Sequence, residues 1–415
     1  MKAKRVVIIG GGVIGLCSAY YALQRGFAVT VIEREPAGAD NCSMGNAGMI
    51  VPSHFTPMAA PGMITKGLRW MLNPESPFYV RPRLSADLLR WGWLFYRHST
   101  ARHVAACREL LRDLNLESRR LFEELAATED FGLKQRGLLM LCKTPKGLDE
   151  EAQVALDAQQ IGLQAEILYP GAVAQLDPDV TLDITGAVYF PQDCHLSPAN
   201  FMASMRRRLI AAGAQIESAV TIDTLVTRGG QVTAVSAKKR RFEGDHFVIA
   251  GGAWSVDLLK SVDVNLSLQA GKGYSLTLPK PPELPRLCSI FAEAKVAITP
   301  MGNSLRFGGT LEVGGLDLTI NPARVRGIVN SVQAYFPKFS ARDFDGVKPW
   351  AGLRPVSPDG VPYLGQVPGL SNLLLATGHA MMGLSLGPVS GRLIADLLAG
   401  DSPFRPIESM SPGRF

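Results

Sequence analysis

Charged residues are scarce in this sequence of 415 residues: Asp, Glu, Lys and Arg make up 19% of it, and aromatic residues only 7%. There are six cysteines and six histidines, and the cysteines are scattered, without a Cys-x-x-Cys pair or a histidine at ligand spacing. This pattern argues against a zinc site, and a chain long enough for a large apolar core needs no disulfide framework. We therefore expect no metal, and reduced thiols in a cytoplasmic protein.

Long apolar runs are also lacking. No uninterrupted stretch of about 18 apolar residues occurs, so we expect no membrane-spanning helix. The apolar stretch near the N-terminus is broken by Gly10–Gly12, which does not fit a signal peptide. Hydrophobic content is nevertheless 47%, which leaves room for a peripheral contact with the inner face of the cell membrane.

Positive charge exceeds negative charge only modestly, with a formal net charge of +6. Two tight basic runs occur, Arg206–Arg208 and Lys238–Arg241, and no nucleic-acid-binding motif accompanies them. We interpret both runs as solvated faces and expect no nucleic-acid partner. Nothing in the sequence indicates an oligomeric state.

The sequence opens with a βαβ pattern. Arg5–Ile9 and Phe27–Ile32 are short, β-branched runs typical of buried parallel strands, and Val13–Gln24 between them is expected to be helical. The turn after the first strand contains the spacing G-x-G-x-x-G, with Gly10, Gly12 and Gly15. Such a turn brings a dinucleotide pyrophosphate to the N-terminus of a helix.

A carboxylate follows at the position that this unit uses for a ribose hydroxyl. Glu33 closes the second strand, 18 residues after Gly15. Three later features favour FAD over NAD: the polar loop Cys42–Gly48, the strand end Ile249–Trp254, and a glycine-rich stretch from Thr377 to Ser385 before a C-terminal helix. A second helix N-terminus so late in the chain suits the polar edge of a flavin ring.

The order of these motifs, together with Gly352–Pro355 and Asp359–Gly360, resembles the D-amino-acid oxidase/glycine oxidase superfamily over nearly the whole chain. Within it, Ala59–Gly62, Trp70–Met71 and Leu89–Trp93 are most similar to D-amino-acid dehydrogenases. The resemblance implies non-covalent FAD, hydride transfer from the substrate Cα to flavin N5, and release of a 2-oxo acid and ammonia. We do not expect Cys42 or Cys288 to tether the flavin.

The resemblance also implies an α/β fold with a glutathione-reductase-type, Rossmann-like FAD domain and a substrate domain built on a large mixed β-sheet. We assign residues 1–53, 145–262 and 345–415 to the first, and residues 54–144 and 263–344 to the second. The residues expected to contact the cofactor are Gly10, Gly12, Val13, Ile14, Gly15, Glu33, Arg34, Ser43, Asn46, Ala47, Gly48, Val220, Gly251, Trp254, Gly352, Arg354, Gly378, His379, Gly383, Leu384 and Ser385.

A free amino acid carries a carboxylate, so its pocket requires a fixed cation. Arg354 is the candidate, because a planar guanidinium binds a carboxylate through two hydrogen bonds and because it matches the family's carboxylate-binding arginine. The alternative is a structural arginine paired with Asp359 or Asp343. Glycine oxidases carry a carboxylate-binding tyrosine on the strand that here reads 295–298, where this chain has none.

Four further side chains are candidates for the substrate site. Tyr274 is expected to add a hydroxyl to the same carboxylate or else to be a sheet aromatic, and Arg306 is either a second carboxylate contact or a surface residue. His54 and His379 are candidates for tuning the loss of the amine proton, the alternative for each being a hydrogen-bonded structural role. Met381 and its neighbour suggest an apolar pocket wall.

Residues 54–100 read as an insertion that faces a membrane or an electron acceptor, because apolar and aromatic side chains alternate with arginines there. A helix that covers the substrate domain is the plain alternative. We expect a dehydrogenase for free D-amino acids, cyclic D-imino acids included, that passes electrons to quinone or another respiratory carrier. A glycine/sarcosine-type oxidase and a non-catalytic flavoprotein subunit are the competing hypotheses.

Overall fold

The computed structural model describes residues 3–415. The two strands of the N-terminal βαβ unit belong to a six-stranded sheet. Its strands, in spatial order, are β19 (Tyr363–Gln366), β20 (Leu373–Thr377), β13 (His246–Ile249), β1 (Arg5–Ile9), β2 (Ala28–Ile32) and β9 (Gln215–Glu217). All neighbours pair in parallel except β19, which is antiparallel to β20. The first strand, the helix α1 (Val13–Gln24) and the second strand confirm the expected βαβ unit.

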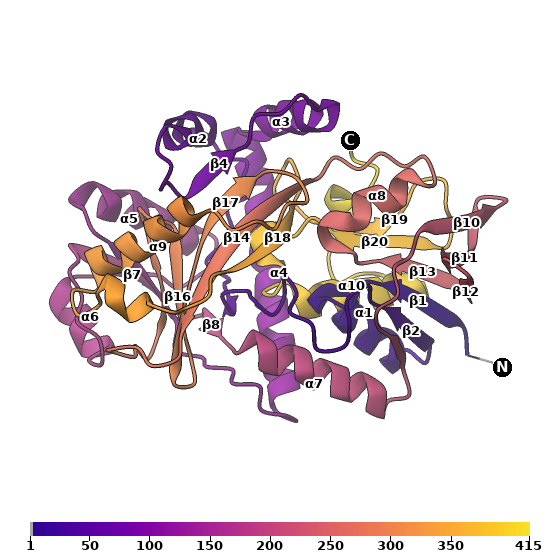
Figure 1. Cartoon of the computed structure of the whole chain (residues 1–415), viewed down its shortest axis with the longest axis horizontal. Helices are drawn as coiled ribbons and strands as arrows, with labels where there is room; N and C mark the ends of the chain where they lie inside the picture. Colours follow the sequence, from indigo (N-terminus) through magenta and orange to yellow (C-terminus); the bar gives the residue numbers. More distant parts are fainter. Residues whose placement is uncertain (1–2) are drawn as a thin grey trace.

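Helices cover one face of this sheet and a small β-meander covers the other (Figure 1). The helical face is formed by α1, α7 (Pro198–Ala211), α10 (Gly387–Ala399) and α4 (Ala101–Ala126). The opposite face carries β10 (Thr224–Arg228), β11 (Gln231–Ala237), β12 (Arg240–Glu243) and α8 (Ser255–Lys260). The helices α1 and α10 approach so closely that a Cβ on Gly391 would lie 2.4 Å from the backbone of Cys17.

The second lobe is built on a mixed nine-stranded sheet. Its strands run in the order β18 (Trp350–Val356), β14 (Gln269–Leu278), β17 (Ser304–Val313), β16 (Val296–Met301), β15 (Cys288–Phe291), β5 (Leu138–Cys142), β7 (Gly186–Phe190) and β6 (Glu166–Leu168), with β4 (Phe78–Val80) beside β17. Helix α9 (Pro322–Tyr335) packs on one face, and α5 (Pro145–Gln160) and α6 (Pro170–Leu176) lie near the β7 edge. This arrangement confirms the expected fold class.

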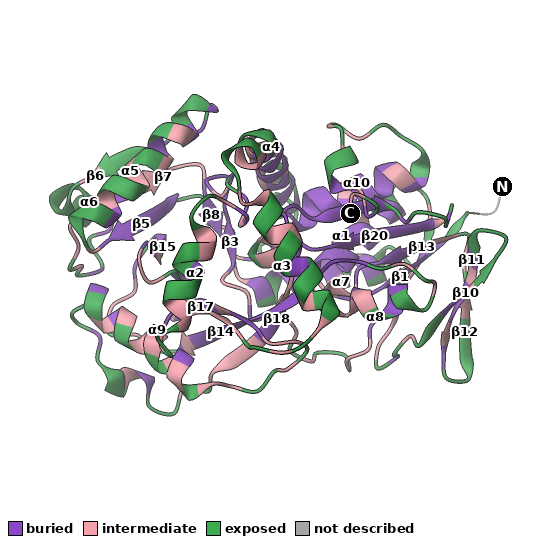
Figure 2. Ribbon diagram, turned by 90° about the horizontal axis from the view of Figure 1, so that it is seen from above, coloured by how far each residue is buried: buried purple, intermediate pink, exposed green. Residues whose placement is uncertain are grey.

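Two short helices stand outside both lobes. Helix α2 (Met63–Met71) and helix α3 (Ala86–His98) lie across the same side of the molecule, joined through β4 (Figure 1). Seen from above, both are largely exposed along their outer surfaces (Figure 2). The first part of the insertion, residues 54–84, therefore contains a helix and a strand. Its helix was missed because proline and glycine flank a pattern of only nine residues.

Sheet membership divides the chain differently from the expected domain boundaries. Strands β6 and β7 pair with β5 in the nine-stranded sheet, although residues 145–262 were assigned to the FAD domain. Strand β18 pairs with β14 in the same sheet, although it lies within residues 345–415, which were also assigned to the FAD domain. Long-range pairing partners decide both cases, and sequence periodicity does not reveal such partners. The division into an FAD unit and a substrate unit remains a proposal.

Candidate functional site

A cavity of about 1200 Å³ runs between the two lobes. Its wall includes the glycine turn after β1, the strand ends of the nine-stranded sheet, and residues of α2 and α3. One continuous space therefore joins the predicted dinucleotide site to the predicted substrate site and to the insertion.

The first βα turn tolerates only glycine at two positions. Gly10 has a φ of +114°, and a Cβ there would lie 2.4 Å from the carbonyl oxygen of Ala250. A Cβ on Gly15 would lie 1.9 Å from the carbonyl oxygen of Gly10, so this glycine permits close packing of helix on strand, as expected. Gly12, Val13 and the next residue line the cavity, which brings the N-terminus of α1 to its wall.

Glu33 lies beside this turn at the end of β2 and is buried. Its Oε2 accepts a hydrogen bond from the backbone N–H of Gly11 (2.6 Å), and its Oε1 accepts one from the N–H of Glu35 (2.9 Å). The guanidinium of Arg34 stacks 3.5 Å from the ring centroid of Trp254, and both residues line the cavity together with Val220. Carboxylate, stacked cation and apolar wall form a slot suited to the adenosine half of a dinucleotide.

The loop from Cys42 to Gly48 is fixed from two sides. Ser43 Oγ accepts a hydrogen bond from the first N–H of α1 (3.0 Å), which ties the loop to the glycine turn. Arg306 Nη1 donates to the carbonyl oxygens of Met44 (2.8 Å) and Asn46 (2.7 Å), and its Nε donates to Thr277 Oγ1 (3.0 Å). Arg306 is half-buried and does not line the large cavity; it borders a separate, smaller cavity instead. It positions the loop whose other side faces the cavity.

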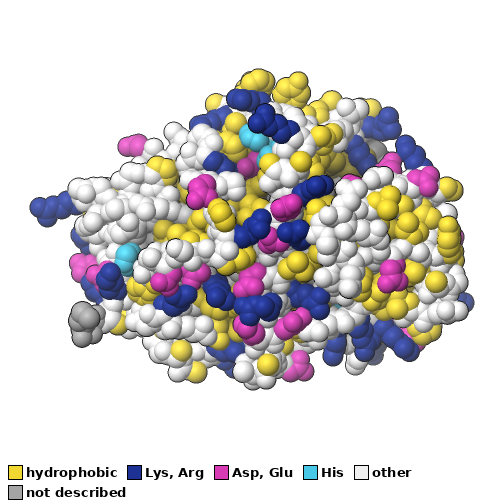
Figure 3. Space-filling model, turned by 180° about the vertical axis from the view of Figure 1, so that it is seen from behind, with side chains coloured by type: hydrophobic (Ala, Val, Ile, Leu, Met, Phe, Trp, Pro, Cys, Tyr) yellow, Lys and Arg dark blue, Asp and Glu magenta, His cyan; other side chains and the backbone are white. Residues whose placement is uncertain are grey.

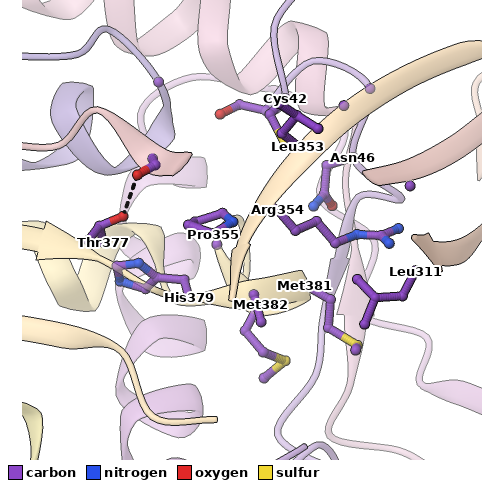
Figure 4. A pocket seen from close by; sticks show the side chains of 18 of the residues that line it. Cys42, Asn46, Leu311, Leu353, Arg354, Pro355, Thr377, His379, Met381 and Met382 are labelled. Carbon is purple, nitrogen blue, oxygen red and sulfur yellow. Dashed lines mark hydrogen bonds between the residues drawn. The ribbon is translucent and has the colours of Figure 1, made fainter. Parts of the chain in front are cut away.

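Arg354 extends from β18 into the cavity, where Figure 4 shows its guanidinium directed toward Leu311 with Met381 nearby. Space for it exists because Gly273 on the neighbouring strand lacks a side chain: a Cβ there would lie 2.3 Å from the guanidinium carbon. Arg354 Nη1 donates to the carbonyl oxygen of Thr310, a residue held at a φ of +68°. Burial lowers the pKa of Arg354 below its usual range.

No carboxylate within residues 3–415 pairs with Arg354. Asp359, one expected partner, accepts two hydrogen bonds from Arg414, and Asp343 caps Ser340 instead. A half-buried guanidinium at a cavity wall without an acidic partner has donors available for a ligand carboxylate. This arrangement is the one expected of a carboxylate-binding arginine.

Tyr274 does not join Arg354. Side chains alternate along β14, so Tyr274 lies on the face opposite Gly273 and Arg354. Its hydroxyl donates to Glu312 Oε2 at 2.9 Å, and burial and this carboxylate together raise the pKa of Tyr274. The structure therefore supports the reading of Tyr274 as a sheet aromatic.

Two histidines of the expected site line the cavity. His379 is 3% exposed, its Nε2 lies 2.9 Å from Ser390 Oγ, and its Nδ1 has no partner among the described residues. Burial lowers the pKa of His379 to about 3, so it is neutral at physiological pH. His54 Nδ1 lies 3.1 Å from Ser53 Oγ. Burial and then Lys295 lower the pKa of His54 to about 4.

Most of the expected cofactor residues line the cavity, and four do not. Gly15, Gly48, Gly378 and Ser385 lie behind its wall. A Cβ on Gly48 would lie 2.4 Å from the carbonyl oxygen of Leu196, and Ser385 Oγ accepts from the Val51 N–H and donates to Asn115 Oδ1 (2.7 Å). These residues shape the backbone that forms the site and do not reach into it.

Sequence reasoning missed Trp350. Its ring lies against the backbone of two glycines, because a Cβ on Gly45 would lie 2.3 Å from it and one on Gly352 would lie 2.0 Å from it. The Trp350 side chain therefore packs the Cys42–Gly48 loop against β18. Gly45 and Gly352 are about 300 residues apart in the sequence. Only the folded structure shows that both leave room for the same tryptophan ring.

The lining fits FAD. The glycine turn, Glu33 and the Arg34–Trp254 stack form one end of the cavity, and the loop of Ser43 and its neighbours leads from there toward the nine-stranded sheet. Cys42 lines the cavity as well, and burial raises the pKa of its thiol to about 11, so the thiol is protonated at neutral pH and a poor nucleophile. Cys288 is fully buried and does not reach the cavity.

The family described as DAO, FAD dependent oxidoreductase, matches residues 5–397. The chain belongs to this family. It is an FAD-dependent oxidoreductase, and its cofactor is FAD.

Solved structures share the fold over nearly their whole length. The chain is similar to glycine oxidase from Geobacillus kaustophilus (24% identity, 100% of each chain covered, TM-score 0.78). It is also similar to L-proline dehydrogenase from P. horikoshii (18% identity, 100% of this chain and 98% of the other, TM-score 0.75). L-α-glycerophosphate oxidase from Mycoplasma pneumoniae, with FAD bound, is similar at 15% identity (96% and 95% covered, TM-score 0.73). Across these relatives the fold hosts different donors, so the substrate must be argued from the cavity.

Proposed function

We propose that this protein oxidises the carbon–nitrogen bond of a free D-amino acid and passes the electrons to a quinone or another respiratory carrier. The observation that supports an amino-acid substrate is Arg354, a guanidinium at the cavity wall without an acidic partner. The D-configuration is supported by the resemblance of the segments around Ala59–Gly62 and Leu89–Trp93 to D-amino-acid dehydrogenases.

Arg354 binds the substrate carboxylate in this proposal, and its bond to Thr310 holds the guanidinium in place. Bound FAD supplies the hydride acceptor. The wall beside the guanidinium is apolar, since Leu311, Met381 and Met382 line it. An apolar wall excludes water from the reacting carbon and favours apolar or cyclic side chains, which makes a cyclic D-imino acid such as D-proline the second candidate substrate.

Anaerobic bleaching of the bound flavin tests this proposal. Paired D- and L-isomers of the same amino acids, both prolines included, are added to the purified holoenzyme without oxygen. Bleaching by D-isomers alone, with an oxo acid as the product, is the expected result. Bleaching by L-isomers would contradict the proposed D-configuration of the substrate. Absence of bleaching by any amine would favour a non-catalytic flavoprotein.

The acceptor proposal rests on α2 and α3. Six large apolar side chains on this insertion are between 57% and 105% exposed: Leu68, Leu72, Leu84, Leu89, Trp93 and Tyr96. Exposed arginines stand among them, and Figure 3 shows hydrophobic and basic side chains together along the edge where Figure 1 places α2 and α3. Exposed apolar side chains with arginines among them suit the surface of an anionic membrane.

The same helices line the cavity, so a lipid-soluble acceptor has a route to the flavin that does not cross the adenosine slot. No helix within residues 3–415 is long and apolar enough to cross a bilayer. Cosedimentation with vesicles of anionic and of zwitterionic lipid tests this attachment. We expect binding to anionic vesicles that falls at least tenfold in the double variant L89S/W93S, whereas equal partitioning of both proteins would contradict it.

The oxidase alternative is tested by peroxide. With a D-amino acid that bleaches the flavin, the dehydrogenase proposal predicts fast reoxidation by a soluble quinone and slow reoxidation by air. Stoichiometric hydrogen peroxide in air would instead assign the protein to the oxidases.

A further inference from the structure

A chain of hydrogen bonds leads from the cavity into the protein behind it. Strand β3 (Met49–Ile50) pairs with β8 (Cys194–His195), and this pairing brings Ser53 against Asp193. The backbone N–H of Ser53 donates to Asp193 Oδ1 (3.0 Å), and Ser53 Oγ donates to Asp193 Oδ2 (2.5 Å). Asp193 is only 1% exposed and does not line the cavity.

His54 connects this pair to the cavity. Its Nδ1 lies 3.1 Å from Ser53 Oγ, and its Nε2 has no hydrogen-bond partner among residues 3–415. The same cavity is also lined by Met140 and Ala297 of the nine-stranded sheet and by Lys295, whose charge acts on His54. His54 therefore lines the same cavity as Arg354.

The direction of the bonds fixes the tautomer of His54. An ionised Asp193 can only accept, so Ser53 gives it the single hydroxyl proton. Ser53 Oγ must then accept from the Nδ1–H of His54, which leaves a lone pair on Nε2 toward the cavity. A neutral Asp193 reverses both bonds, and His54 then carries its proton on Nε2.

We propose that Asp193, Ser53 and His54 form a proton relay that removes the proton from the substrate ammonium group before oxidation. The inference rests on the proposed function, because that function supplies the ammonium group. The N–H bond of the substrate breaks and a new bond forms at His54 Nε2. The Nδ1 proton moves to Ser53 Oγ, and the Ser53 hydroxyl proton moves to Asp193 Oδ2. The substrate amine, His54 and Asp193 all end neutral, and no electrons are transferred. Between turnovers the proton leaves Asp193 by the reverse path, through Ser53 and His54 to water in the cavity.

The relay explains how a half-buried histidine with a lowered pKa serves as a base. Burial and then the charge of Lys295 oppose an imidazolium at this site, so direct protonation of His54 at neutral pH is disfavoured. In the relay His54 never carries charge, because it gains one proton as it loses another. The charge that disappears is that of Asp193, whose pKa is raised to about 7 by burial, against the lowering effect of the Ser53 bonds and of Arg119.

Few other groups near Asp193 titrate in the same range. The charge of Arg119 on α4, which pairs with Glu123, lowers the pKa of Asp193, and the thiols of Cys194 and Cys288 are its neighbours on β8 and β15. Burial raises the pKa of both thiols, that of Cys194 to about 12, so both remain neutral through the pH range in which the carboxyl changes charge. Lys295 faces His54 from the turn before β16, and its Nζ lies 3.6 Å from Glu151.

Nitrogen NMR of the histidine side chains tests the relay without turnover. In the wild-type holoenzyme above pH 7 we expect His54 protonated on Nδ1, its signals being assigned by their loss in H54Q. In D193N the amide must donate to Ser53 Oγ, so we expect the proton on Nε2. The same tautomer in both proteins would overturn the relay. Should D193N not fold, a wild-type tautomer that stays unchanged as the pH falls through 7 would overturn it equally.

Rapid kinetics supply the second readout. We expect D193N and S53A to slow flavin bleaching by a D-amino acid about 100-fold, the scale of general-base catalysis, while the affinity for a carboxylate inhibitor stays within twofold. S53T, which keeps the hydroxyl, should recover most of the rate. D177N is the matched control, because Asp177 is equally buried but accepts backbone N–H groups of Arg286 and Leu287 outside the cavity.

The outcomes separate the two proposals. Normal bleaching of the wild type with unchanged rates in D193N and S53A would overturn the relay and leave the proposed function standing. Absence of bleaching by every amino acid in the wild type would overturn the proposed function instead, whatever the tautomer.

Discussion

Replacement of Arg354 by lysine is the substitution that most sharply separates substrate binding from cofactor binding. Lysine keeps the positive charge but lacks the planar guanidinium that binds a carboxylate through two hydrogen bonds. Its side chain is also too short to keep the hydrogen bond to the carbonyl oxygen of Thr310. Because the guanidinium has no acidic partner among the described residues, its removal leaves no protein carboxylate unpaired. The cost should therefore appear in substrate binding and hardly at all in folding.

The size of the effect follows from the site. Loss of one partner of a desolvated, hydrogen-bonded charge pair costs about 2–5 kcal/mol. At about 1.4 kcal/mol per factor of ten, the dissociation constant of a D-amino acid should rise roughly 30-fold to several thousand-fold. R354K should lie near the lower limit, since charge remains, and R354M near the upper.

Anaerobic titration of flavin bleaching measures this constant, and flavin content per chain serves as the internal control. Arg326, an exposed arginine that pairs with Glu75 on the outer face of α9, offers a matched control in R326K. Unchanged substrate affinity in both R354K and R354M would refute the assignment of the carboxylate site. Loss of flavin in R354K with normal substrate affinity would show that Arg354 belongs to the cofactor site instead.

Three other substitutions probe the rest of the site. R306A removes the donors to Met44 and Asn46, so the loop loosens and the FAD dissociation constant should rise at least tenfold; equal flavin retention on gel filtration would contradict this. G10A places a methyl group 2.4 Å from a carbonyl oxygen at a φ of +114°, and should lower stability to urea by about 1–3 kcal/mol and abolish FAD binding, whereas an intact holoenzyme would show the turn to be permissive. His195 is 2% exposed, and burial lowers its pKa from 6.5 to about 4, so the unfolded chain binds the proton more tightly. Its contribution to the free energy of unfolding is complete above pH 6.5 and falls by about 1.4 kcal/mol per pH unit down to about pH 4. Urea melts at pH 5 and 7 should therefore show a smaller pH dependence in H195Q than in the wild type, and identical slopes would contradict the shift.

Local sequence signals predicted the parts of the fold that depend on near neighbours. The βαβ unit was correct to within a residue at each end, because buried β-branched runs and glycine turns are local features. Strand β18 has no such local signal, since glycine and proline interrupt it and its pairing with the distant β14 makes it a strand.

The site shows the same division. Arg354 was predictable because it lies in a recognisable motif and its chemistry matches a carboxylate. The contact of Arg306 with the Cys42–Gly48 loop needed the three-dimensional structure, because the backbone carbonyls that it binds are about 260 residues away along the chain. The relay from His54 to Asp193 was invisible for the same reason, since Ser53 and Asp193 are 140 residues apart.

One comparison tests the central claim most directly: anaerobic flavin bleaching by a D-amino acid and by the amine that lacks only its carboxylate. The account predicts that the amino acid bleaches the wild type at low concentration and that the amine binds at least 30-fold more weakly. In R354M the two compounds should bind about equally, because the difference between them arises from Arg354. Equal bleaching of the wild type by both compounds would contradict the claim that this cavity recognises a free amino acid.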